Sequence, residues 1–316
     1  MLAPASDEYR VQRGESRAAR VTGQERMLAP ASDRQIKKKA RYLSMKKVLT
    51  IAGSDCSGGA GIQADLKTFA AHGVFGMSVI VSVVAENTSR VIGIQNVTAD
   101  MIAKQVDAVF EDIGADTVKI GMLSVPESME AVAAKIRQYR PRIVVTDPVM
   151  YAKGGCPLME ENAIDTFIKT VLPVSDILTP NIPEAEKISG MKIASIKDME
   201  NAARKICSMG CRVVVVKGGH AEGSALDVLY DGKEFFYYDT ERIGTKNTHG
   251  TGCTFSSAIA AQMAKGKNIH EAVGEAKNYV AMAIKHSLSI GKGNGPTHHF
   301  YELYRSGLCE KDKGEE

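Results

Sequence analysis

Short apolar runs alternate with amphipathic stretches along most of the chain. Runs rich in Val and Ile occupy residues 48–53, 77–85, 116–122, 142–150, 176–181 and 212–219. Between them, segments such as 61–73, 99–114 and 196–210 repeat apolar residues at helical spacing. Continuous apolar strands separated by helices predict a mostly parallel sheet that is covered on both faces. The pattern therefore predicts one α/β domain with three layers, α/β/α.

Two further elements follow from the pattern toward the C-terminus. Residues 225–239 place Asp231-Gly232 between two strand-like runs, which predicts a β-hairpin. Residues 269–289 have a sustained helical period and predict a long final helix.

The first 44 residues lack this alternation. They are rich in Arg, and the segment MLAPASD occurs twice, at Met1 and Met27. Their acidic residues count against an organelle presequence. We expect residues 1–44 to be a leader that is disordered or an artefact of the start site, with Met45 as the functional start. The folded domain is then expected over residues 45–305 and a polar tail over 306–316.

Charge and cysteine content narrow the class of protein. The net charge is +3, but residues 1–47 carry 12 basic and 5 acidic residues, which leaves the remaining chain at −4. A weakly acidic body argues against a nucleic-acid surface. The six cysteines lack the spacing of a secreted disulfide framework, and no apolar run is long enough for a membrane span. We expect a soluble, cytoplasmic protein, with Cys207 and Cys211 in structural roles rather than as metal ligands.

Candidate ligand-binding residues lie where the predicted strands end. In open α/β sheets, ligands collect outside the carboxyl ends of the strands. The segments at these ends are Gly53 to Gly61, Glu86 to Thr88, Met122, Asp147, Asn181 to Glu184, and Lys217 to His220.

The turn Gly250-Thr251-Gly252-Cys253 precedes a run of small and apolar residues that suits a closely packed helix. Free N–H groups and the positive end of the helix dipole point out of such a start and favour an anion. The same field favours a thiolate, so we expect the pKa of Cys253 to fall. The turn is then expected to bind a transferred phosphoryl group, with Cys253 taking a proton from the acceptor. The alternative is a buried cysteine in a tight turn.

Charged residues at other strand ends fit this chemistry. Lys217 would leave a buried strand beside the phosphates, although a lysine at a strand end is often a solvated cap. Asn181 and Glu184 lie three residues apart where a strand passes into a helix, and such a pair can hold hydrated Mg²⁺. The alternative is an ordinary helix N-terminus. Asp147 would add a second carboxylate, or simply form an Asp-Pro turn.

The Gly-rich segment AGSDCSGGAGIQAD (residues 52–65) follows the first predicted strand. It lacks the Gly-Lys-Ser/Thr ending of a P-loop and does not match G-x-G-x-x-G in register. We therefore expect it to form the wall of a site for a small acceptor molecule.

Together these residues resemble the ribokinase-like superfamily, and within it the hydroxymethylpyrimidine/phosphomethylpyrimidine kinases of thiamin biosynthesis. The resemblance spans about residues 45–305 and is carried by TIAGSDCSGGAGIQADLKTFAAHGVFG, KIGML, DPVM, LTPNIPEAE, VVKGGH, KNTHGTGCTFSSA and GPTHHF. It implies the ribokinase-like fold, a homodimer, ATP and Mg²⁺. The reaction implied is phosphorylation of 4-amino-5-hydroxymethyl-2-methylpyrimidine, and then of its monophosphate.

The resemblance also assigns roles to residues. Cys253 stands at the position of the catalytic base, and Gly250, Thr251 and Gly252 form the anion hole. Further assignments place Lys217, Asn181 and Thr248 at the nucleotide phosphates, Asp147 and Glu184 at the metal, and Gly53, Asp65, Met122 and Glu86 at the acceptor.

Glu86 departs from the family pattern, which usually has glutamine in this position. A glutamine amide both donates and accepts hydrogen bonds, whereas a carboxylate only accepts. Glu86 fits the pyrimidine if the ring nitrogen is protonated or if burial protonates Glu86 itself. The alternative is a kinase of the same family that acts on pyridoxine or pyridoxal. Two further alternatives are a ligand-binding protein without turnover and a thiol redox protein. The redox protein would need a Cys-x-x-Cys pair, which Cys207 and Cys211 do not supply.

Overall fold

The computed structural model describes residues 45–152, 154–219 and 225–308. The predicted leader over residues 1–44 lies outside the described residues, as does most of the predicted tail. Among the described helices, none combines the length and the apolar character needed to cross a bilayer.

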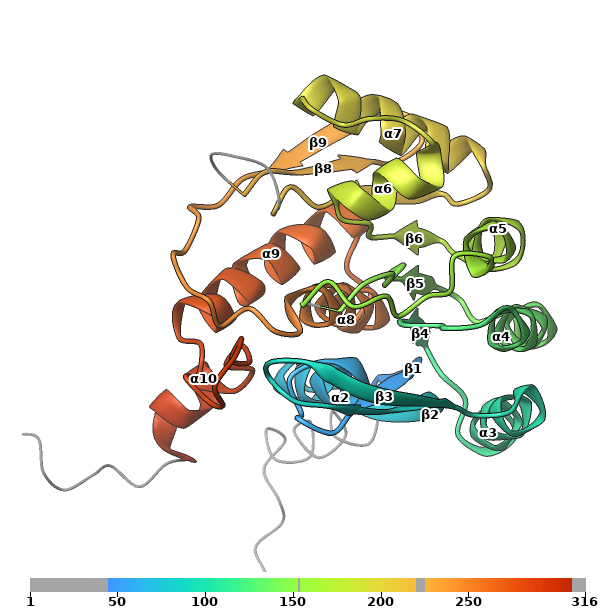
Figure 1. The fold of residues 1–316 in the computed structure, drawn as a ribbon, viewed down its shortest axis with the longest axis horizontal. Coiled ribbons are helices and arrows are strands. Elements are labelled where there is room, and N and C mark those ends of the chain that lie inside the picture. Colours follow the sequence, from blue (N-terminus) through green and yellow to red (C-terminus); the bar gives the residue numbers. More distant parts are fainter. Residues whose placement is uncertain (1–44, 153, 220–224, 309–316) are drawn as a thin grey trace, which may run out of the picture. The chain divides into compact units, whose positions relative to one another are not determined.

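The described strands form one nine-stranded sheet in the order β3-β2-β1-β4-β5-β6-β7-β8-β9 (Figure 1). The strands are β1 (Lys47–Asp55), β2 (Phe75–Glu86), β3 (Val91–Asn96), β4 (Thr117–Ile120), β5 (Val144–Thr146), β6 (Ile177–Leu178), β7 (Val213–Val216), β8 (Asp227–Tyr230) and β9 (Phe235–Tyr238). Strands β2, β1, β4, β5, β6 and β7 run parallel, while β3, β8 and β9 pair antiparallel. The predicted mostly parallel sheet and the hairpin are confirmed, and β3 is an edge strand that was not predicted.

Helices cover both faces of the sheet, which gives the predicted three layers (Figure 1). One face carries α3 (Ala99–Asp112), α4 (Pro126–Tyr139), α5 (Ala163–Thr166), α6 (Ile182–Ser189) and α7 (Ile196–Ser208). The other carries α2 (Gly61–Ala71), α8 (Thr251–Ala264) and α9 (Ile269–Lys285). The short turns η1 (Phe167–Val171) and η2 (Leu172–Val174) follow α5, and α10 (Tyr301–Leu303) and η3 (Tyr304–Leu308) follow α9.

Alternate strand residues supply the two cores on either side of the sheet. On β1, Leu49 and Ile51 pack with the core under α3 and α4, while Val48 packs with the core under α8. This alternation follows from the two-residue period of a strand. Helix α8 is buried on almost every side because its side chains are small, which explains how it lies close to both the sheet and α9.

Candidate active site

A cavity of about 610 Å³ opens at the carboxyl ends of the parallel strands. Asp55 and Glu86 end β1 and β2, and Met122, Asp147 and Lys217 follow β4, β5 and β7. A cavity of this size is typical of small-molecule sites. The cavity therefore lies at the edge of the sheet that the strand-end rule indicated.

The predicted turn before α8 is present and forms part of the cavity wall. Gly250 is the N-cap with φ 77°, and a Cβ there would lie 1.8 Å from the Gly59 carbonyl oxygen, so the position requires glycine. The Thr251 hydroxyl donates to the Thr248 carbonyl at 2.7 Å. Helix α8 begins at Thr251 and places Cys253 in its first turn, beside amides that lack helical partners.

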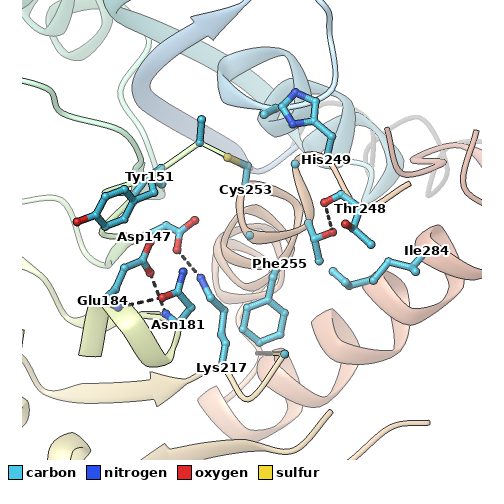
Figure 2. Close-up of a pocket in the computed structure, with 18 of the residues that line it drawn as sticks. Asp147, Tyr151, Asn181, Glu184, Lys217, Thr248, His249, Cys253, Phe255 and Ile284 are labelled. Carbon is cyan, nitrogen blue, oxygen red and sulfur yellow. Dashed lines mark hydrogen bonds and ion pairs between the residues drawn. The ribbon is translucent and has the colours of Figure 1, made fainter. Parts of the chain in front are cut away.

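Lys217 and Asp147 form an ion pair in the middle of the cavity wall (Figure 2). Lys217 Nζ lies 2.7 Å from Asp147 Oδ1, which also accepts from the Thr179 hydroxyl at 3.2 Å. Although burial opposes it, the carboxylates of Asp147 and Glu184 raise the pKa of Lys217. The other oxygen of Asp147 approaches the turn, since a Cβ on Gly252 would lie 3.2 Å from Oδ2.

Asn181 and Glu184 start α6 with a capping box. Asn181 Oδ1 accepts from the Glu184 N–H at 2.9 Å, and Glu184 Oε2 accepts from the Asn181 N–H at 2.8 Å. The alternative that the sequence left open, an ordinary helix N-terminus, is thus realised. Both residues nevertheless line the cavity. Burial, with Asp147 nearby, raises the pKa of Glu184 to about 7 despite the favourable charge of Lys217.

The acceptor side contains a cluster of Asp55, Glu86 and His249 whose ligand atoms lie within 4.8 Å of one another. Asp55 accepts from the amides of Ser57, Gly59 and Ala60 at 2.7–3.0 Å and from His249 Nε2 at 2.8 Å. Despite the opposing effect of burial, these bonds lower the pKa of Asp55. Asp55 therefore stabilises the conformation of the Gly-rich loop and links it, through His249, to the turn before α8.

Glu86 has a different environment from Asp55. Burial is the main cause that raises its pKa, to about 7, and the neighbouring Asp55 carboxylate adds to this while His249 opposes it. A carboxyl group at this position is poised to carry a proton near neutral pH.

Gly53 and Met122 face each other across the same wall. A Cβ on Gly53 would lie 3.4 Å from Met122 Sδ, and the β1–β2 register shifts between Ala52 and Gly53. The missing side chain and the shift leave room for a ligand to approach the backbone.

Asp65 does not line the cavity, so its prediction as a residue of the acceptor wall is corrected. The side chain is fully buried and accepts from Lys119 Nζ at 2.9 Å, Ser257 Oγ at 2.7 Å and Thr50 Oγ1 at 2.6 Å. Asp65 lies on α2 and points toward β1 and α8, because a charged side chain without solvent requires partners for its oxygens.

The expected fall in the pKa of Cys253 is also wrong for this structure. Burial raises the pKa of the thiol to about 12, and the carboxylates of Asp65 and Asp147 add to the effect. Lys119 and the Gly61 N–H lower it, and so does the helix N-terminus, but they do not balance the burial. Burial and these two carboxylates therefore favour the protonated, neutral thiol of Cys253.

The far end of the cavity is apolar. Phe255 on α8 and Val280, Ala281 and Ile284 on α9 line it (Figure 2 labels Phe255 and Ile284). These residues were not predicted as part of a site, because an apolar stripe on a helix normally packs against the protein core.

The chain matches one protein family over most of its length. The model of the family described as phosphomethylpyrimidine kinase matches residues 55–298. The chain belongs to the phosphomethylpyrimidine kinase family. Its site residues can therefore be discussed as those of a phosphotransferase.

Individual relatives agree with this family. The chain is 47% identical over 260 residues to the hydroxymethylpyrimidine/phosphomethylpyrimidine kinase of Bacillus subtilis, covering 82% of this chain and 96% of that one. It is 48% identical over 253 residues to the thiamine biosynthesis bifunctional protein of Geobacter sulfurreducens, covering 80% of this chain and 52% of that protein, so it spans about half of that relative's length. An ADP complex of Bacillus subtilis pyridoxal kinase has a TM-score of 0.76 and 39% identity, with 83% of this chain and all of that chain covered. These similarities confirm the predicted ribokinase-like architecture.

The structure brings most of the predicted kinase residues to one cavity. They are Gly53, Glu86, Met122, Asp147, Asn181, Glu184, Lys217, Thr248, Gly250, Thr251, Gly252 and Cys253. Asp55 and His249 were not predicted as site residues, although both lie within motifs that carry the family resemblance. Their hydrogen bonds hold the Gly-rich segment in place, and a sequence pattern does not reveal such contacts. Lys119 was also missed, since a lysine in a short apolar strand gives no pattern signal.

Proposed function

We propose that this chain is an ATP-dependent kinase that phosphorylates 4-amino-5-hydroxymethyl-2-methylpyrimidine and then its monophosphate. The observation that carries the proposal is that the Gly250–Cys253 turn, Lys217 and the acceptor wall of Gly53, Glu86 and Met122 open into one cavity. Phosphoryl transfer depends mainly on positioning and on stabilising charge, which these groups supply.

The proposed nucleotide position follows from the two kinds of surface in the cavity. The apolar end around Phe255 and Ile284 suits a nucleobase, while Lys217, Thr248 and the amides of Gly250 to Cys253 suit phosphates. The terminal phosphate then lies between the helix N-terminus and the acceptor wall. In this arrangement Lys217 and the amides stabilise the negative charge that moves during transfer.

Asp147 and Glu184 would hold Mg²⁺. The fit rests on two buried carboxylates that line the cavity beside Lys217, each with one oxygen in a capping or ion-pair contact. Mg²⁺ prefers one or two carboxylates together with phosphate oxygens and water. The ion would neutralise phosphate charge when bound.

Cys253 is proposed as the group that takes the proton from the hydroxymethyl oxygen. Because burial raises the pKa of this thiol, the proposal requires the pKa to fall when ATP and the acceptor bind, so that the thiolate can form. Asp147 raises the proton affinity of Cys253, so neutralising Asp147 would lower the pKa of the thiol. The second transfer needs no base, because the acceptor phosphate is already ionised at neutral pH.

A direct assay tests the proposal. ATP consumption by the purified protein is measured with the pyrimidine alcohol, with its monophosphate and with pyridoxal as acceptors. We expect turnover with both pyrimidines at higher kcat/KM than with pyridoxal. A preference for pyridoxal would favour the second candidate, a pyridoxal kinase, which the similarity to the Bacillus subtilis enzyme and the carboxyl group of Glu86 make reasonable.

A homodimer is part of the proposal. Val83, Ile92 and Ile94, on β2 and the edge strand β3, are 53%, 65% and 38% exposed. Exposed apolar side chains on neighbouring strands of a sheet edge are typical of an interface between chains. Light scattering is expected to give twice the mass of one chain, and a monomeric mass at micromolar concentration would reject the dimer.

A further inference from the structure

A lysine and an aspartate form a solvent-free ion pair behind the acceptor wall. Lys119 Nζ on β4 lies 2.9 Å from both carboxylate oxygens of Asp65 on α2, and both side chains are 0% exposed. Taking two charges out of water carries a large desolvation cost, so a buried pair is weak support for stability by itself. The pair can instead be important through its electrostatic effect on the Cys253 thiol.

Helices α2 and α8 connect this pair to Cys253. Gly61 begins α2 and Cys253 lies in the first turn of α8, and the two helices pack against each other. One helical turn further along each helix, Ser257 Oγ on α8 donates to Asp65 Oδ1 on α2 at 2.7 Å. Because a helical turn advances about 5.4 Å, the ion pair lies roughly one turn behind the thiol.

The ammonium group has a fixed place in the wall. A Cβ on Gly121 would lie 2.7 Å from Lys119 Nζ and 2.9 Å from the Ala52 Cβ, so no space remains there. Ala52 and Met122, on either side of this contact, line the cavity. Asp65 is itself held by Thr50 Oγ1 at 2.6 Å, which leaves the pair little freedom to rearrange.

We propose that Lys119 is a positioning residue for Cys253: its ammonium, locked by Asp65 behind the wall, supplies the fixed positive charge against which the sulfur loses its proton. The catalytic consequence rests on the proposed function, but the electrostatic effect on the thiol does not. Lys119 touches neither substrate nor nucleotide in this account. It acts through the sulfur.

The other charges that face Cys253 define what Lys119 has to offset. Burial raises the pKa of the thiol most, and Asp65 from α2 and Asp147 after β5 raise it further. Of the groups that lower the pKa of the thiol, Lys119 on β4 has the largest effect and the Gly61 amide a smaller one. Lys217, after β7, also interacts electrostatically with the sulfur. Hydrogen bonds from Thr50 and Ser257 spread the Asp65 charge, which limits its opposing effect.

The test follows alkylation of Cys253 by iodoacetamide at fixed pH, without nucleotide, by peptide-resolved mass spectrometry. Lys119→Met is expected to slow alkylation about tenfold or more, because each pKa unit changes the thiolate fraction tenfold. Exposed Cys56, in the same molecule, serves as the internal reference and should not change. Wild-type alkylation of Cys253 in a folded Lys119→Met protein would overturn the proposal.

A second variant covers the case in which Lys119→Met does not fold. Lys119→Met with Asp65→Leu removes both charges, so no unpaired charge stays buried. It is expected to slow Cys253 alkylation by a smaller factor, and an unchanged rate in this folded variant would overturn the proposal. Lys135→Met removes a lysine paired with Asp107 at 2.7 Å between α4 and α3, and it should leave the rate unchanged. Equal slowing in that variant would show that the effect does not depend on the lysine near Cys253, and would contradict a specific role for Lys119.

Activity provides an independent readout. In the folded variants, Lys119→Met is expected to lower kcat of the hydroxymethyl transfer with little change in KM for the pyrimidine. An altered KM with normal kcat would contradict the positioning role. If the wild-type protein phosphorylates neither pyrimidine, the proposed function fails, while the alkylation result still decides whether Lys119 acts on the sulfur.

Discussion

The molecule contains two Lys–Asp pairs near Cys253 that differ in what else can reach them. Lys217 and Asp147 meet at 2.7 Å on the cavity surface, where the Lys217 side chain is 16% exposed. Lys119 and Asp65 have no exposed surface, and the Asp65 carboxylate also accepts from Thr50 Oγ1 and Ser257 Oγ. The first pair can exchange its internal contact for a phosphate or a metal ion, whereas the second cannot. We therefore expect the first pair to bind ligands and the second to supply a fixed positive charge near the thiol.

The largest expected difference between the pairs is in stability. Lys119→Met should cost about 3–5 kcal/mol of unfolding free energy, because it leaves the Asp65 charge buried without its partner. Lys217→Met should cost less, since Asp147 lines the cavity and keeps its hydrogen bond from the Thr179 hydroxyl. Urea denaturation of both variants measures this. Equal losses would remove the distinction between the pairs.

In activity the order should reverse. Lys217→Met is expected to lower both phosphoryl transfers by about 10²–10³-fold, the range for loss of one group that stabilises transition-state charge. Initial rates with the alcohol and with the monophosphate provide the measurement, and Lys135→Met is the matched control. Loss confined to one transfer would argue against a role for Lys217 at the phosphates.

Glu184→Gln tests the metal proposal without disturbing the start of α6. Glutamine retains the capping-box geometry while removing the charge. We expect the Mg²⁺ concentration for half-maximal rate to rise about tenfold or more. Removal of Mg²⁺ with a chelator should stop both variant and wild type. A rate that responds to Mg²⁺ as in the wild type would place the ion elsewhere.

The smallest predicted effect concerns pH at the acceptor wall. The pKa of Glu86 is raised from 4.5 to about 7, so the folded state favours the protonated form, and this contribution to stability is lost as pH rises through about 7. Protonated Glu86 can both donate and accept, as a glutamine amide does. We therefore expect KM for the pyrimidine to rise a few-fold from pH 6 to pH 8.

Glu86→Gln is the control for this pH dependence. It should keep or improve pyrimidine use and show a flat KM over the same range. A wild-type KM that falls with pH would show that the carboxylate is the binding form. A strong loss of activity in a folded Glu86→Gln protein would instead reveal a specific contact of the charged group.

The sequence predicted the fold and the edge of the sheet that carries the site, because both follow from periodicity. Buried strands appear in the sequence as Val-rich runs. The residues that follow parallel strands lie together, because these strands end at the same edge of the sheet. The turn Gly250–Cys253 was predictable as well, since its glycines and small residues restrict the backbone.

What depends on three-dimensional surroundings was not predictable. The raised pKa of Cys253 comes from burial and from carboxylates on other elements, none of which is near it in sequence. Asp65 and Lys119 are 54 residues apart, so neither position reveals that they pair. Asp55 and His249 are separated by 194 residues, and their link appears only when the loop closes on the turn.

We propose that Cys253 acts as the base of the first transfer, next to the amides that would hold the transferred phosphate. The direct test compares Cys253→Ala with the wild type in the two half-reactions, using purified alcohol and purified monophosphate. We predict that the first transfer falls by about 10²-fold or more, while the second is comparatively spared. Equal losses in the two half-reactions, or a first transfer at the wild-type rate, would contradict the claim.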